Sequence, residues 1–128
     1  RIHAAGKYVI IHSHGKVRGF MDEFVKMGAD GLDVLEPCTS VTGDVDLREV
    51  KQRYGKKLCL IGSIQYSDIA QGDTASIERM VANNMEAAKE GGGYIIEPTA
   101  DPYGVSLDER TADNFITYFK MARKYGMY

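Results

Sequence analysis

The feature that most constrains this chain is a fourfold alternation of short apolar runs with longer amphipathic stretches. Each apolar run is continuous, as in a strand buried on both faces of a sheet. The runs occupy residues 8–11, 31–35, 58–61 and 94–96. Apolar positions at helical spacing follow every run. This alternation predicts parallel strands paired in chain order, joined by right-handed crossovers, with the helices on one side of the sheet.

Capping residues mark the ends of the predicted helices. Gly28 closes the first helical stretch and Gly55 closes the second, because glycine is the usual residue after a helix. Asp46, with a glutamate three residues later, has the spacing of a capping box at the start of the second helix. The third helix is expected to start after Asp73 and to end at the three glycines of residues 91–93.

Composition excludes several classes of function. The 128 residues include 16 Lys+Arg and 18 Asp+Glu, for a net charge of −2, and 44% are hydrophobic. This length and apolar fraction suit one domain with one core. A near-neutral balance argues against nucleic-acid binding, and no charge-free run is long enough to span a membrane. Only two cysteines favour a cytoplasmic location, and the start at Arg1 suggests a fragment or a processed chain.

Two α/β architectures accommodate such repeats, a doubly wound sheet and half of a (β/α)8 barrel. The chain contains neither Gly-x-Gly-x-x-Gly nor Gly-x-x-x-x-Gly-Lys-Ser/Thr, the two nucleotide-binding fingerprints. Both architectures bind ligands at the carboxyl ends of their strands. Polar residues gather at all four predicted strand ends, at positions 12–15, 36–38, 62–66 and 97–101. These positions hold the candidate site.

Two histidines follow the first predicted strand. Side chains alternate along an extended chain, so His12 and His14 are expected to point the same way. Two imidazoles near Glu36 or Glu97 predict a site for zinc or a similar metal. The alternative is that one imidazole caps a helix or bonds a carbonyl while the other is solvated. Cys38 also lies at a strand end, where a thiolate could bind metal, although packing is the favoured interpretation.

Five further side chains are candidates for contact with substrate or for catalysis. Glu36 and Glu97 each precede a proline, which holds the preceding residue extended. They are candidate proton-transfer groups or metal ligands, and the alternative is a structural carboxylate in an ion pair. Gln65, Tyr66 and Tyr103 lie in predicted strand-end loops. We expect these three to bind substrate.

A set of motifs resembles the carboxyl-terminal half of the uroporphyrinogen decarboxylase superfamily. The motifs are His12-x-His14-Gly15, residues 28–32 (GADGL), 60–64 (LIGSI) and 92–96 (GGYII), Asp108-Glu109-Arg110 and Asn114. The resemblance covers nearly the whole chain. It implies a (β/α)8 barrel in which residues 1–128, as a single-domain fragment, supply strands five to eight. The superfamily also contains cobamide-dependent methyltransferases.

The methyltransferase branch resembles this chain best at His12. Its members hold zinc with a His-x-Cys-Gly motif and a later cysteine, and the zinc activates a thiol. His12 matches the histidine, His14 stands in place of the first cysteine, and Ala100 stands in place of the second. The resemblance implies metal-assisted methyl transfer, with zinc at His12 and His14 and a cobamide or other corrinoid as methyl donor. The candidates for a third ligand are Glu36, Cys38, Glu97 and Asp101.

Two other functions stay open at this point. One is a porphyrinogen decarboxylase of tetrapyrrole biosynthesis, which needs no metal, although Ala100 replaces that branch's substrate-contacting histidine. The other is a non-catalytic module that binds a tetrapyrrole or corrinoid. The expected partners are a small-molecule substrate or a corrinoid protein, and either a second copy or an amino-terminal barrel half. That partner would cover barrel-facing apolar side chains, expected to be Val9, Ile11, Leu60 and Ile95.

Overall fold

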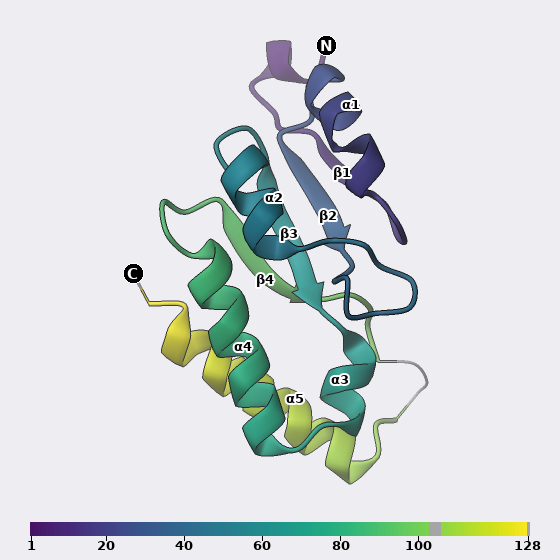
Figure 1. The fold of residues 1–128 in the computed structure, drawn as a ribbon, viewed down its shortest axis with the longest axis vertical. Coiled ribbons are helices and arrows are strands. Elements are labelled where there is room, and N and C mark those ends of the chain that lie inside the picture. The colour runs from purple at the N-terminus through teal and green to yellow at the C-terminus, as the bar shows by residue number, and fades with distance from the viewer. Residues whose placement is uncertain (103–105, 128) are drawn as a thin grey trace.

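A computed structural model describes residues 1–102 and 106–127 of the chain (Figure 1). Its centre is a four-stranded parallel sheet in the order β1-β2-β3-β4. The strands are β1 (Ile10–His12), β2 (Gly31–Leu35), β3 (Cys59–Ile64) and β4 (Tyr94–Pro98). Strands that are consecutive in the chain are neighbours in the sheet, as predicted. This α/β arrangement is that of half of a (β/α)8 barrel.

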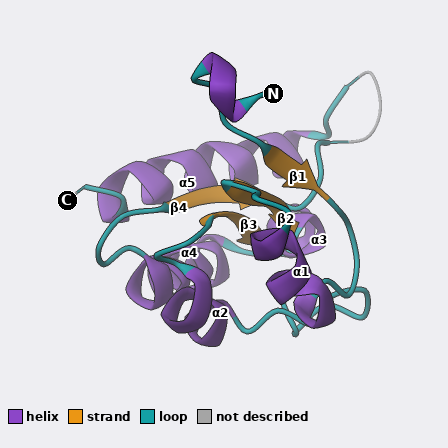
Figure 2. Cartoon of the chain, turned by 90° about the horizontal axis from the view of Figure 1, so that it is seen from above, coloured by secondary structure: helices purple, strands orange, loops and turns teal. Residues whose placement is uncertain are grey.

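Helices connect the strands and cover the sheet. In the described part of the chain the α-helices are α1 (Met21–Lys26), α2 (Leu47–Tyr54), α3 (Tyr66–Gln71), α4 (Thr74–Ala88) and α5 (Glu109–Tyr125). Two short 3-10 turns, η1 (His3–Ala5) and η2 (Arg18–Phe20), precede β1 and α1. Figure 2 shows α5 running beside β4, where the Tyr118 hydroxyl donates to the carbonyl of Ile96 at 3.1 Å. No helix among the described residues is long and apolar enough to cross a membrane.

Most of the predicted helix ends are confirmed. Asp46 and Asp73 are the N-caps of α2 and α4, and each accepts a hydrogen bond from the backbone N–H three residues later. Gly28 follows α1 with φ of 81°, a left-handed conformation that favours glycine. Helix α3 was not predicted, because six residues are too few to show a helical period. The first strand also begins two residues later than its apolar run suggested, at Ile10.

The helices pack against one face of the sheet in a single apolar cluster. Leu32 and Leu60, at the centre of the sheet, are fully buried in this cluster together with Ile77 of α4. The opposite face, called the inner face below, has no such cover from residues 1–102 and 106–127. On it Ile10 and Ile95 are 57% and 51% exposed.

The expected set of barrel-facing side chains is therefore partly wrong. Ile95 faces inward as expected, but Leu60 and Ile11 belong to the helix-covered side. Val9 precedes the strand. In a continuous apolar run, polar and apolar residues do not alternate, so the sequence does not show which side chains face the inside of the barrel. The expectation that a second copy or further barrel strands cover the inner face stays a prediction, as does the assignment of residues 1–128 to barrel strands five to eight.

Asn114, one of the family-like motif residues, has a structural role in this fold. Its buried amide donates to the carbonyls of Ile69 at 2.8 Å and Gly72 at 3.0 Å, which fastens α5 to the α3–α4 connection. We expect Asn114→Ala to lower the free energy of unfolding by about 1–3 kcal/mol, because it removes two hydrogen bonds from a buried amide to backbone carbonyls. Urea denaturation measures this. The neighbouring exposed residue provides the control: Asp113→Ala should change the same quantity by less than about 0.5 kcal/mol.

Candidate functional site

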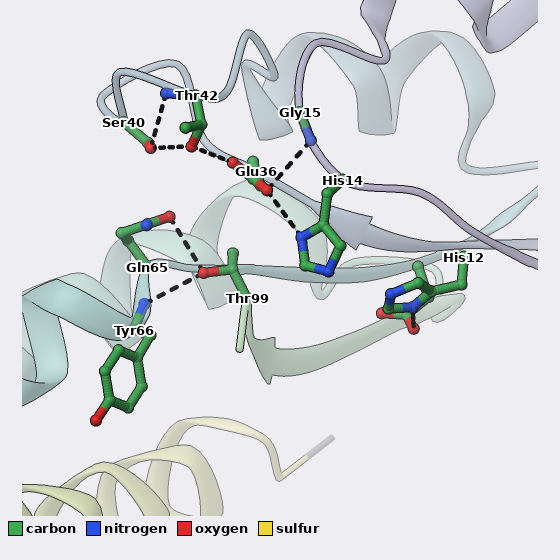
Figure 3. Close-up of polar contacts among 10 residues, drawn as sticks. His12, His14, Gly15, Glu36, Ser40, Thr42, Gln65, Tyr66 and Thr99 are labelled. Carbon is green, nitrogen blue, oxygen red and sulfur yellow. Dashed lines mark hydrogen bonds and ion pairs between the residues drawn. The ribbon is translucent and has the colours of Figure 1, made fainter. Parts of the chain in front are cut away.

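Each of the two strand-end histidines is bound to a carboxylate from β2 or its end. His12 Nδ1 lies 2.6 Å from Asp33 Oδ2, and His14 Nδ1 lies 2.9 Å from Glu36 Oε1 (Figure 3). The two imidazole rings meet edge to face with centroids 4.9 Å apart. The imidazoles are more than half exposed, whereas the Glu36 side chain is 8% exposed. His14 thus contacts one of the two predicted glutamates, Glu36, whereas His12 contacts Asp33.

The pairing fixes which ring nitrogen is free. An ionised carboxylate only accepts hydrogen bonds, so the imidazole nitrogen that faces it carries the proton. In both histidines that nitrogen is Nδ1, which leaves the Nε2 lone pair available. Metal-binding histidines typically show this arrangement, with the other nitrogen bonded to a carboxylate. The same arrangement suits an imidazole that accepts a proton.

Glu36 is a buried carboxylate whose two oxygens are both occupied. Its Oε1 also accepts the backbone N–H of Gly15 at 3.1 Å, and its Oε2 accepts the hydroxyl of Thr42. Burial pushes the pKa of Glu36 upward, but the hydrogen bonds from Thr42, His14 and Gly15 outweigh it, so the net pKa is lowered. Glu36 therefore stays ionised and holds His14 in one orientation.

Both histidines line a cavity of about 350 Å³ at the carboxyl end of the sheet. Asp33 of β2, Glu97 near the end of β4, and residues that follow β4, among them Ala100 and Asp101, also line it. In the described part of the chain, Asp33 Oδ1 is buried without a hydrogen-bond partner. A polar atom in this state needs a donor or a cation to offset its desolvation.

The second predicted catalytic glutamate lies in the same cavity but in a different environment. Glu97 follows the inner-face residue Ile95 by two positions in β4, so it points to the same side of the sheet. Burial raises the pKa of Glu97, and the negative charges of Asp33 and Asp101 raise it further, while His12 lowers it. This carboxyl consequently takes up a proton more readily than Glu36 does.

Of the predicted substrate-binding residues, Gln65 and Tyr66 are not among those that line this cavity. Gln65 lines a separate cavity of about 700 Å³ between α2, α3 and α4, and Cys38 lines the same one. Tyr66 is part of α3 and packs against Phe115, with ring centroids 6.0 Å apart. Tyr103 lies outside the described residues.

Thr99 links the two cavities and was not predicted. It lines the histidine cavity, and its hydroxyl donates to Gln65 Oε1 at 3.1 Å and accepts the backbone N–H of Tyr66 at 3.2 Å. Asp33 and Thr42 were also missed as site residues. Asp33 interrupts an apolar run, and this interruption was the one signal in the sequence that a polar group is held inside β2.

The residues of the histidine cavity fit a metal through two imidazole nitrogens, with carboxylates of the same cavity as candidates for a further ligand. His12 and His14 present two free Nε2 atoms, whereas no three His, Cys, Asp or Glu side chains converge as a metal site within residues 1–102 and 106–127. Cys38 lies in the other cavity and Glu36 is bound to His14. The acidic candidates for a third ligand that line the histidine cavity are Glu97 and Asp101.

The lowered pKa of Glu36 predicts a dependence of stability on pH. A carboxyl with a lowered pKa in the folded state adds stability above the pKa of an unperturbed glutamate, about 4.3, and this contribution disappears as the pH falls. Glu36→Gln should therefore make the free energy of unfolding decline less between about pH 5 and pH 3. Urea denaturation across this range measures the change. Glu90→Gln, at an exposed position just after α4, should leave the pH dependence as it is in the unaltered protein.

The comparisons with known proteins give one family for this chain. No curated protein matches the chain. The family model described as uroporphyrinogen decarboxylase (URO-D) matches residues 1–117, which is most of the sequence and includes all the strand ends around the cavity. The chain therefore belongs to the uroporphyrinogen decarboxylase family.

Proposed function

We propose that this protein is an enzyme of the uroporphyrinogen decarboxylase superfamily that carries out metal-assisted methyl transfer linked to a corrinoid. One observation carries the proposal. Positions 12, 14 and 100 resemble the three zinc-ligand positions of the methyltransferase branch, and all three line one cavity. They come from two strand ends far apart in the sequence. A cavity that joins these positions favours the methyltransferase branch.

Two imidazoles and one carboxylate form the proposed ligand set. The Nε2 atoms of His12 and His14 would hold a zinc ion, and Asp33 and Glu36 would orient the two rings through Nδ1. When bound, zinc supplies Lewis-acid chemistry and lowers the pKa of a coordinated nucleophile. Either Glu97 or Asp101 would add an oxygen ligand. Ligands of this kind also suit iron, cobalt and manganese.

The remaining side chains have proposed roles that follow from their surroundings. The raised pKa of Glu97 suits a group that gives or takes a proton beside the reacting atoms. Glu36 is occupied by three donors, so its proposed role is to hold His14. Gln65 and Tyr66 would contact a substrate only where it extends past Thr99 toward the larger cavity.

The charge of the cavity argues against the decarboxylase alternative. Asp33, Glu97 and Asp101 contribute three carboxyl groups to its lining, and no Lys or Arg is among the described residues that line it. A porphyrinogen with acidic side chains would be repelled at this surface. The alternative of a non-catalytic corrinoid-binding module predicts corrinoid binding without turnover, so an activity measurement separates it.

Metal content tests the proposed ligands directly. We expect His12→Ala and His14→Ala to reduce bound zinc to background, measured by element-resolved mass spectrometry of the purified protein. His3→Ala is a matched control, because His3 also pairs with a carboxylate, Asp30 at 2.8 Å, but at the amino end of β1. Equal zinc content in all three variants would contradict the proposal.

Activity separates the three functions. A full-length protein with the complete barrel should remove the methyl group of methylcobalamin in the presence of a thiol acceptor and should leave uroporphyrinogen unchanged, whereas residues 1–128 alone should not be fully active. Because the reaction needs the zinc-holding imidazoles, His14→Ala should lower the methyl-transfer rate about 100-fold or more. Conversion of uroporphyrinogen would support the decarboxylase instead, and corrinoid binding without turnover would support the module.

A further inference from the structure

Behind Glu36 lies a chain of hydroxyl groups that the methyl-transfer proposal does not use. The Ser40 and Thr42 hydroxyl oxygens are 2.8 Å apart, and the Thr42 hydroxyl bonds Glu36 Oε2 (Figure 3). The backbone N–H of Thr42 also donates to the Ser40 hydroxyl at 3.2 Å. On its other side, Glu36 holds His14. Four side chains are thus connected in one line.

The direction of each hydrogen bond in this line is determined. Ionised Glu36 only accepts, so the single hydroxyl proton of Thr42 points at the carboxylate. Thr42 has no second proton, so the Ser40 hydroxyl donates to Thr42. At the other end, His14 must donate through Nδ1. Glu36 therefore accepts hydrogen bonds from His14 on one side and from Thr42 on the other.

The loop that carries these hydroxyls is fixed against the carboxylate by its backbone. Pro37 and Val45 form a parallel bridge, and the Val45 N–H donates to the carbonyl of Glu36 at 3.1 Å. Gly43 packs so closely here that a Cβ atom would lie 2.4 Å from the carbonyl oxygens of Glu36 and Pro37. This loop conformation therefore requires glycine at position 43.

We infer that Thr42, supported by Ser40, is a positioning residue that fixes the Nδ1-protonated form of His14 by holding Glu36 in place. Thr42 touches neither the cavity nor a proposed ligand atom, and it acts through Glu36 alone. With Thr42 present, both carboxylate oxygens are occupied and the carboxylate plane is fixed against the imidazole. Without it, Oε2 loses its donor, Glu36 can rotate, and His14 can exchange its proton between Nδ1 and Nε2. The role of His14 as a zinc ligand rests on the proposed function, whereas the hydrogen bonds that connect Thr42, Glu36 and His14 do not.

The tautomer of His14 is observable without activity or metal. In the metal-free full protein with 15N-labelled histidine, NMR of the imidazole nitrogens should show His14 protonated at Nδ1. Thr42→Val should raise the Nε2-protonated fraction of His14 several-fold, whereas Thr42→Ser, which keeps the hydroxyl, should not. His12 pairs with Asp33 instead, so its signals should stay unchanged in both variants. Thr39→Val is the matched control on the same loop, because the Thr39 hydroxyl is outside this network.

Zinc titration provides the second measurement. Thr42→Val should weaken zinc affinity by about 10-fold, the lower end of the effect of removing a group that orients a metal-binding histidine. If that variant does not fold, Ser40→Ala provides the test, since it removes the hydroxyl that donates to Thr42 and accepts its backbone N–H, and it should shift His14 in the same direction. An unchanged His14 tautomer in either folded variant, or an equal shift in Thr39→Val, overturns the inference. Absence of zinc binding in the unaltered protein overturns the proposed function instead, and the NMR result is unaffected by it.

Discussion

The hydrogen-bond register between β1 and β2 is the constraint on which the site depends. It pairs His12 with Asp33, so the imidazole and the carboxylate stand side by side on the inner face. The register continues past the end of β1, where the Ser13 N–H donates to the carbonyl of Asp33 at 2.6 Å and His14 reaches Glu36. A slip of one residue would turn His12 toward the helices, because side chains alternate along a strand. Two imidazole–carboxylate pairs therefore result from one register.

The carboxyl groups at this end of the sheet are of two kinds: Glu36 is held by hydrogen bonds to both oxygens, whereas Asp33 and Glu97 can still change their partners or protonation. Glu36 is saturated by donors, which explains both its burial and its lowered pKa. Asp33 keeps one buried oxygen without a partner, and the pKa of Glu97 is raised first by burial and then by neighbouring negative charge. Asp33 can gain a partner for its free oxygen, and Glu97 can take up a proton readily. Ligand binding should therefore act on Asp33 and Glu97, while Glu36 preserves the geometry.

The sequence predicted the strand order and the helix ends well, because apolar periodicity and capping residues are local signals. It also brought His12 and His14 to the same strand ends as Glu36 and Glu97, since strand ends of a parallel sheet meet at one edge. Gln65, predicted to bind substrate, lines the larger cavity instead, because β3 continues to Ile64 and Gln65 then turns toward that cavity. Thr42 gave no signal at all. Its contact with Glu36 depends on a loop that folds back over six residues, and neither periodicity nor composition describes such a loop.

Histidine at position 14 and the burial of Glu36 depend on each other. In the methyltransferase branch that the chain resembles, a cysteine thiolate would stand at this position. A thiolate carries no proton to donate, and it would place a second negative charge beside a carboxylate whose side chain is only 8% exposed. An imidazole instead donates through Nδ1, satisfies the carboxylate and still offers Nε2 as a ligand. Histidine at position 14 therefore suits this buried carboxylate as a cysteine thiolate would not, and the hydroxyls of Ser40 and Thr42 complete the surroundings of Glu36.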